Sequence, residues 1–222
     1  MAGYYEEKLA ADRLRQAYGC APPRIRQYLQ AEIDYIGGFI RPGDSVLELG
    51  CGYGRVLRAL ADKTAFLTGI DTSRASLDEA RCNVPDRVAL VQTDASRLGL
   101  GGGAFDLVVC IQNGISAFHV DPAVLFAESI RVTKKGGKVL FSSYAETFWP
   151  ERIVWFKIQA ELGLLGEIDP EKSTDGRIVC KDGFTARTFT LTQFKQIMSG
   201  FEHPFTLCEV DNSSVFCEIT VV

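Results

Sequence analysis

The sequence has few of the features that mark membrane, secreted or metal-binding proteins. No apolar run approaches the roughly 20 residues needed to cross a bilayer, and the first residues are charged and lack the apolar middle of a signal peptide. Histidine occurs only twice, and the seven cysteines form no C-x-x-C pair. We therefore expect a cytoplasmic protein with reduced thiols and no bound metal.

Positive charge is also scarce. The chain has 24 Lys and Arg against 28 Asp and Glu, a formal net charge of −4. Affinity for phosphate comes largely from Lys and Arg that displace counterions. A nucleic-acid or anionic-membrane partner is therefore disfavoured, and we expect a small-molecule partner. Nothing in the sequence indicates an oligomeric state.

Short apolar runs alternate with helical patterns through the middle of the chain. The strands are expected at 45–49, 66–70, 87–91, 105–111 and 138–142, and helices after residue 54 and at 73–82 and 122–132. This alternation predicts an α/β fold with a doubly wound, mostly parallel sheet covered on both faces. Two further strands at 204–210 and 215–222 would complete seven, with an antiparallel strand at the sheet edge.

At 222 residues the chain fits one domain with four parts. Residues 1–40 are expected to form a helical cap, broken by Pro22 and Pro23 into two helices. Residues 41–143 form the core and residues 188–222 a C-terminal helix with the strand pair. We interpret the aromatic-rich stretch 144–187 as an insertion that covers one end of the sheet.

The alternating glycines after the first strand are the most informative motif. Gly50, Gly52 and Gly54 separate a buried strand from a helical pattern, and glycine lets the backbone turn sharply and approach a ligand. The next strand ends in Asp71, where a carboxylate suits the two hydroxyls of a ribose. We expect a nucleoside-bearing ligand at the carboxyl ends of the strands. The alternative is a tight turn followed by an exposed Asp.

The residues around the glycines disfavour a dinucleotide. In the pattern G-x-G-x-x-G the third glycine would fall on Arg55 or Leu57. Glu48 lies two residues before the first glycine, where a carboxylate repels a pyrophosphate and attracts an amine or a sulfonium. The sequence thus favours a cationic nucleoside over NAD.

Taken together, these motifs resemble those of class I S-adenosylmethionine-dependent methyltransferases. The run from Glu48 to Gly54 resembles their first motif, and Asp71 is similar to their ribose-binding acid. Residues 105–110 and 135–139 resemble the fourth-strand motif and the turn into the fifth strand. The resemblance implies a Rossmann-like fold with S-adenosylmethionine as cofactor.

The same resemblance implies roles for individual residues. Asp94 would accept from the adenine amino group, and the N–H of Ala95 would face the ring. The expected cofactor contacts come from the first motif, the tips of the second and third strands, the loop after the fourth strand and the helical cap: Glu48, Gly50, Cys51, Gly52, Gly54, Asp71, Thr72, Asp94, Ala95, Gln112 and Tyr18.

The sequence says less about the site that binds the methyl acceptor, which we expect the insertion 144–187 to shape. Residues 110–116 loosely resemble a loop of small-molecule N-methyltransferases, which implies that Asn113 helps to hold the acceptor. A general base matters only for an acceptor that arrives protonated. His119 is the candidate, because an unperturbed histidine has a pKa near 6.5; the alternative is a surface histidine. Trp149 and Trp155 could form an acceptor wall or a local core.

The predicted function is methyl transfer from S-adenosylmethionine to a small-molecule acceptor, mainly through positioning. Two alternatives stay open at this point. One is an NAD-type oxidoreductase, and the other is a non-catalytic module that binds S-adenosylmethionine.

Overall fold

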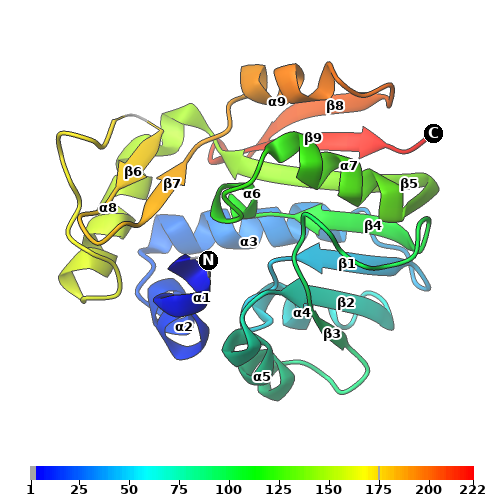
Figure 1. Cartoon of the computed structure of the whole chain (residues 1–222), viewed down its shortest axis with the longest axis horizontal. Coiled ribbons are helices and arrows are strands. Elements are labelled where there is room, and N and C mark those ends of the chain that lie inside the picture. The colour runs from blue at the N-terminus through cyan, green and yellow to red at the C-terminus, as the bar shows by residue number, and fades with distance from the viewer. Residues whose placement is uncertain (1–3, 175) are drawn as a thin grey trace.

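A seven-stranded sheet forms the centre of the molecule (Figure 1). The computed structural model describes residues 4–174 and 176–222, so the first three residues of the predicted cap lie outside the described residues. The strand order is β3-β2-β1-β4-β5-β9-β8. The strand bounds are β1 Ser45–Leu49, β2 Phe66–Asp71, β3 Ala89–Gln92, β4 Phe105–Cys110, β5 Thr133–Tyr144, β8 Phe205–Val210 and β9 Ser214–Thr220.

The strand directions confirm the predicted mostly parallel sheet. Strands β3, β2, β1, β4 and β5 pair in parallel, whereas β9 pairs antiparallel with both β5 and β8. The antiparallel strand therefore lies one position in from the edge, and β8 forms the edge itself. Strand β5 begins at Thr133 and includes the predicted turn at 134–137, with an irregular register where it leaves β4.

Helices cover both faces of the sheet and one end of it. Their bounds are α1 Tyr4–Glu7, α2 Ala11–Gly19, α3 Pro23–Gly37, α4 Arg55–Leu60, α5 Arg74–Asn83, α6 Gly114–Ala117, α7 Pro122–Val132, α8 Trp149–Glu161 and α9 Leu191–Met198, with a 3₁₀ turn at Glu146–Phe148. Helices α4 and α5 contribute to one apolar core, and α7 and α9 to a second core on the other face. Both faces are therefore buried, as a parallel sheet requires.

The N-terminal segment forms three helices where the sequence predicted two. Pro23 occupies the first turn of α3, where its missing N–H costs nothing. The additional break lies between α1 and α2, where Ala11 has a φ of +49°. The short α1 and α2 lie beside the segment 144–187, on the left of Figure 1.

The predicted insertion consists of the 3₁₀ turn, α8 and a two-stranded sheet of β6 (Arg177–Val179) and β7 (Thr185–Arg187). It is joined to the N-terminal helices by side-chain hydrogen bonds. Trp155 Nε1 donates to Ala17 O at 3.0 Å, and Arg13 Nη2 donates to Gly163 O at 2.7 Å. Among the described residues, no helix is long and apolar enough to cross a membrane.

Candidate functional site

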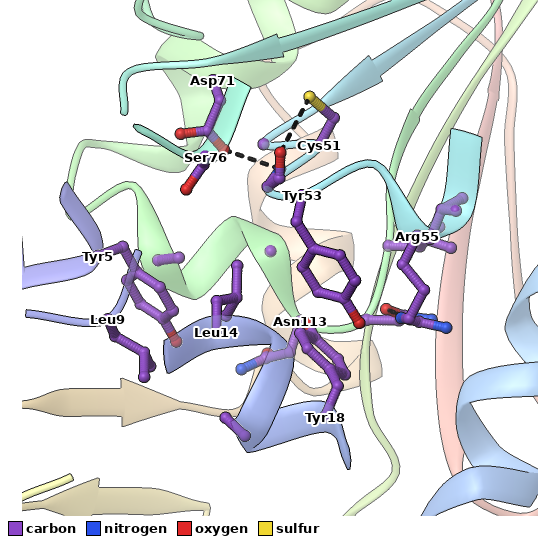
Figure 2. A pocket seen from close by; sticks show the side chains of 18 of the residues that line it. Tyr5, Leu9, Leu14, Tyr18, Cys51, Tyr53, Arg55, Asp71, Ser76 and Asn113 are labelled. Carbon is purple, nitrogen blue, oxygen red and sulfur yellow. Dashed lines mark hydrogen bonds between the residues drawn. The ribbon is translucent and has the colours of Figure 1, made fainter. Parts of the chain in front are cut away.

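A cavity opens at the carboxyl ends of β1, β2 and β4, between the glycine loop, α2 and α8 (Figure 2). We call it the first cavity. Nine of the residues predicted to bind cofactor or acceptor line it: Tyr18, Glu48, Gly50, Cys51, Gly52, Asp71, Thr72, Gln112 and Asn113. The structure thus brings together residues that lie on four different segments of the chain.

The glycines of the loop adopt backbone conformations that other residues rarely take. Gly50, Gly52 and Gly54 have φ angles of +71°, +52° and +82°. A Cβ on Gly52 would lie 2.8 Å from Leu14 Cδ2, so α2 approaches the loop closely. Gly54 does not line the cavity; a Cβ there would lie 2.8 Å from Val84 Cγ1 and 3.2 Å from Ala80 Cβ. It permits the close packing of α4 on α5.

Asp71 fastens the tip of β2 to the glycine loop. Its Oδ2 accepts from Gly52 N at 2.9 Å, and its Oδ1 accepts from Ser73 N at 2.8 Å. Figure 2 shows the side chain pointing toward the loop. Asp71 also lines the first cavity, so the hydroxyl groups of a ligand bound there would lie near a carboxylate.

Glu48 is the acidic group at the floor of the first cavity. It is 5% exposed, and its Oε2 has no hydrogen-bond partner among the described residues. Burial raises the pKa of Glu48 to about 8; Arg55 opposes this and the charge of Asp71 adds to it. A buried polar atom without a partner is costly unless a ligand supplies one. The site therefore suits a ligand with a cationic or N–H group.

The loop after β4 is held in an unusual conformation. Gln112 and Asn113 have φ angles of +57° and +60°. Asn113 Oδ1 accepts from Ser143 Oγ at 2.7 Å, and Gln112 Oε1 accepts from the guanidinium of Arg55. The Arg55 guanidinium also lies 4.7 Å from the centre of the Tyr18 ring. Cation–π contact and hydrogen bond together join α2, the glycine loop and the loop after β4.

Glu32 is a site residue that the sequence analysis missed. It is fully buried on α3, and its Oε2 accepts from Gln112 N at 2.6 Å and from Ser142 Oγ at 2.8 Å. Burial raises its pKa to about 7. The sequence does contain a pattern that indicates this buried carboxyl group, because Glu32 falls at helical spacing among the apolar residues Tyr28, Leu29 and Ile36. A carboxylate on an apolar helix face has to find a buried partner.

Three other predicted site residues lie outside the lining of the first cavity. Asp94 is exposed, and its Oδ1 accepts from the backbone N and the hydroxyl of Ser96, both at 2.7 Å. Ala95 is buried, while its neighbour Thr93 lines the cavity. His119 is exposed with a φ of +52°. The roles of Asp94 and Ala95 in adenine binding and of His119 as a base stay predictions.

Aromatic side chains from the N-terminal helices and the insertion form the remaining wall of the first cavity. Tyr5, Tyr18, Tyr144, Trp155 and Phe156 all line it. Trp155 is therefore both a cavity wall and part of the local core, whereas Trp149 lies elsewhere. In residues 4–174 and 176–222, no group of three or more His, Cys, Asp or Glu side chains could hold a metal ion.

Residues 46–137 match the family model described as a methyltransferase domain. The chain is 34% identical over 140 residues to a demethylmenaquinone methyltransferase of Beutenbergia cavernae, covering 62% of this chain and 56% of that protein. It is 32% identical over 120 residues to a ubiquinone biosynthesis O-methyltransferase of Sodalis glossinidius, covering 50% and 46%. The matches thus span about half the length of these relatives.

Solved structures share the fold over nearly the whole chain. The magnesium protoporphyrin IX methyltransferase of Synechocystis, solved with bound SAH, superposes with a TM-score of 0.66 at 18% identity, covering 99% of this chain and 97% of that one. The PH0226 protein of Pyrococcus horikoshii also superposes with a TM-score of 0.66, at 20% identity, covering 99% and 98%. The sheet and its flanking helices therefore have the Rossmann-like methyltransferase fold.

Proposed function

We propose that this chain, which contains a methyltransferase domain of the class I S-adenosylmethionine-dependent type, transfers a methyl group from S-adenosylmethionine to a small-molecule acceptor. The observation that carries the proposal is the buried Glu48 oxygen that has no partner among the described residues, beside the glycine loop in the first cavity. Burial raises the pKa of Glu48 to about 8; a nucleoside with positive charge would favour the ionised form of this group, whereas a pyrophosphate would disfavour it.

Three groups of the first cavity would hold the cofactor. Asp71 would accept hydrogen bonds from the ribose hydroxyls, and the backbone of Gly50 and Gly52 would allow close approach of the ligand. Glu48 would face the amine or the sulfonium. Asp94 Oδ1 accepts from Ser96, and Asp94 Oδ2 would accept from the adenine amino group.

Bound there, S-adenosylmethionine would supply an electrophilic methyl group. The task of the protein is then to align the acceptor with that group and exclude water, which can contribute on the order of 7–11 kcal/mol. The rings of Tyr18 and Tyr144 lie in the cavity wall, where an aromatic face stabilises a nearby cation by about 0.5–2 kcal/mol. Asn113 would help to orient the acceptor; this role is supported by Ser143, which fixes the side-chain oxygen of Asn113.

The names of the relatives support an acceptor of small size. Two of them are described as methyltransferases of demethylmenaquinone and of ubiquinone biosynthesis. We extend to this chain only the class of acceptor, a small organic molecule. The cytoplasmic location and the lack of a nucleic-acid partner stay predictions.

Calorimetric titration with S-adenosylmethionine and NAD in parallel tests the proposal. We expect saturable binding of S-adenosylmethionine and no detectable binding of NAD. Binding of NAD alone would favour an oxidoreductase and overturn the proposal. The non-catalytic alternative is tested separately, by the formation of S-adenosylhomocysteine when candidate acceptors are added to the protein together with S-adenosylmethionine.

A further inference from the structure

A second cavity lies on the other side of Tyr144, between α8 and the β6–β7 hairpin. Arg152 from α8 lines it, together with Trp149 and the two hairpin arginines Arg177 and Arg187. Glu146 is the acidic side chain that lines it among the described residues. The second cavity is therefore rich in positive charge, although the chain as a whole is acidic.

Arg152 is a buried cation without a buried anion. Its relative exposure is 0%, and within the described part of the chain it forms no ion pair with Asp or Glu. Its guanidinium lies 4.5 Å from the ring centre of Tyr144 and 5.7 Å from that of Trp149. Aromatic faces offset part of the desolvation cost of a buried cation, but proteins seldom bury one without a counter-ion.

The hydrogen bonds of Arg152 leave one edge of the guanidinium unused. Nη1 donates to Thr188 Oγ1 at 2.7 Å and to Gly176 O at 3.2 Å. Nε and Nη2 have no partner among the described residues. These two nitrogens form the edge that donates two parallel hydrogen bonds to a carboxylate or a phosphate.

The hairpin supplies an independent observation. Arg177 and Arg187 are directly opposite each other in the β6–β7 register, and both are exposed. Like charges directly opposite across a strand pair destabilise it. Neither side chain forms an ion pair with an acid among residues 4–174 and 176–222. An anion held between the hairpin and Arg152 would relieve this repulsion.

We propose that the second cavity binds an oxyanion of the methyl acceptor, a carboxylate or a phosphate, through the Nε and Nη2 edge of Arg152 and the charges of Arg177 and Arg187. Its assignment to the acceptor rests on the proposed function. Tyr144 lines both cavities, and Ala186 lines the first while its neighbour Arg187 lines the second. A molecule anchored on Arg152 would extend past Tyr144 toward the first cavity.

Matched small probes test this proposal without knowledge of the acceptor. Benzoate, phenyl phosphate and the neutral benzamide are titrated into the wild-type protein, and affinities are measured by calorimetry in a buffer without oxyanions. We expect at least one of the two anions to bind about tenfold or more tightly than benzamide, because bidentate charge-assisted pairs are the strong ones. Preference for benzoate or for phenyl phosphate identifies the kind of oxyanion.

The tryptophan content allows the binding to be located. The chain has two tryptophans, so Trp155→Phe leaves Trp149 as the fluorophore beside Arg152. The preferred anion should change Trp149 fluorescence with the same affinity as measured by calorimetry. Binding of the anion with no change at Trp149 would place it elsewhere and overturn the proposal.

Two sets of variants separate anion binding from a structural role of Arg152. Arg152→Met should bring the anion and benzamide affinities within about twofold of each other.

Since that variant removes the hydrogen bonds to Thr188 and Gly176 and could unfold the chain, the double variant R177Q/R187Q is measured as well. Both of its positions are exposed, and we expect it to weaken anion binding about three- to tenfold. Arg58→Gln, at an exposed position on α4, is the matched control and should change nothing.

The outcomes distinguish this proposal from the proposed function. If wild type binds the anions and benzamide equally, the oxyanion site is overturned, whatever S-adenosylmethionine does. If the anions are preferred and S-adenosylmethionine fails to bind, the oxyanion site stands, and both methyl transfer and the assignment of this site to a methyl acceptor are overturned.

Discussion

The two cavities that Tyr144 lines contain buried polar groups of opposite charge type. The first contains a buried carboxyl oxygen of Glu48 without a partner among the described residues, and the second contains the similarly unpaired Nε and Nη2 of Arg152. The glycine loop and the strand tips of the first cavity lie within residues 46–137, which match the methyltransferase-domain model, whereas α8 and the β6–β7 hairpin of the second cavity lie outside that match. The acidic group of the first cavity thus lies within the matched residues, and the buried cation of the second lies beyond them.

The largest expected effect is at the first cavity. Asp71→Ala should weaken S-adenosylmethionine binding by about 2–3 kcal/mol, or roughly 30- to 150-fold, because it removes a charged acceptor for the ribose and the bond to Gly52. Calorimetry measures the effect. Asp71→Asn keeps one acceptor oxygen and should lose less. The same variants should leave benzoate binding at the second cavity unchanged, and a parallel loss there would show that the two cavities are not independent.

The second largest effect is a dependence of stability on pH, which arises from buried carboxyl groups at the first cavity and beside it. The pKa of Glu48 is raised to about 8 and that of Glu32 to about 7. The folded chain therefore holds protons that the unfolded chain has lost above about pH 4.5. Stability is lost as the pH rises through these values.

Thermal unfolding between about pH 7 and pH 9 measures that loss. We expect the melting temperature of the wild type to fall by about 4–8 °C, which corresponds to about 2 kcal/mol. Glu48→Gln cannot ionise and should show a smaller fall, and Glu48→Gln combined with Glu32→Gln the smallest. A fall of the same size in all three proteins would mean that other groups cause it.

A smaller effect of opposite sign is expected at the second cavity. Arg177→Gln removes one of two like charges that face each other across the hairpin, so it should stabilise the protein. The expected gain is about 0.2–1 kcal/mol, or roughly 1–2 °C in melting temperature. Excess phosphate should reduce the difference from wild type, since a bound anion relieves the same repulsion. A variant less stable than wild type would indicate that Arg177 has an attractive partner.

The smallest effect is expected for His119. It is exposed and is not part of the lining of the first cavity. His119→Ala should therefore leave the affinity for S-adenosylmethionine within about twofold of wild type. Calorimetry decides this, and a larger loss would mean that the loop at residue 119 closes over the ligand.

The glycine loop and the strand tips of the first cavity were largely predictable from the sequence because their geometry is local. Gly50, Gly52 and Asp71 lie at strand ends that the apolar runs predict, and a positive φ or a strand-tip carboxylate has a recognisable residue type. Asp94 shows where this reasoning ends. Its side chain accepts from the hydroxyl of Ser96. No spacing rule predicts whether this carboxylate binds Ser96 or the amino group of an adenine.

The second cavity was not predictable in the same way. Arg152 is buried because α8 packs against a hairpin more than 20 residues further along the chain, and in the sequence it is one of many charged residues on a helix. The register that pairs Arg177 with Arg187 depends on the turn between them. For Trp149 and Trp155 the sequence left open whether they form an acceptor wall or a local core; the structure packs both into the core and places them at different cavities.

The central claim is that the first cavity binds a cationic adenosine compound through Asp71 and Glu48. A crystal structure of the protein with S-adenosylmethionine tests it most directly. The account predicts ribose hydroxyls within hydrogen-bond distance of the Asp71 carboxylate and the sulfonium end of the ligand facing Glu48. An empty cavity, with Tyr53 or Arg55 occupying the space of the ligand, would contradict it.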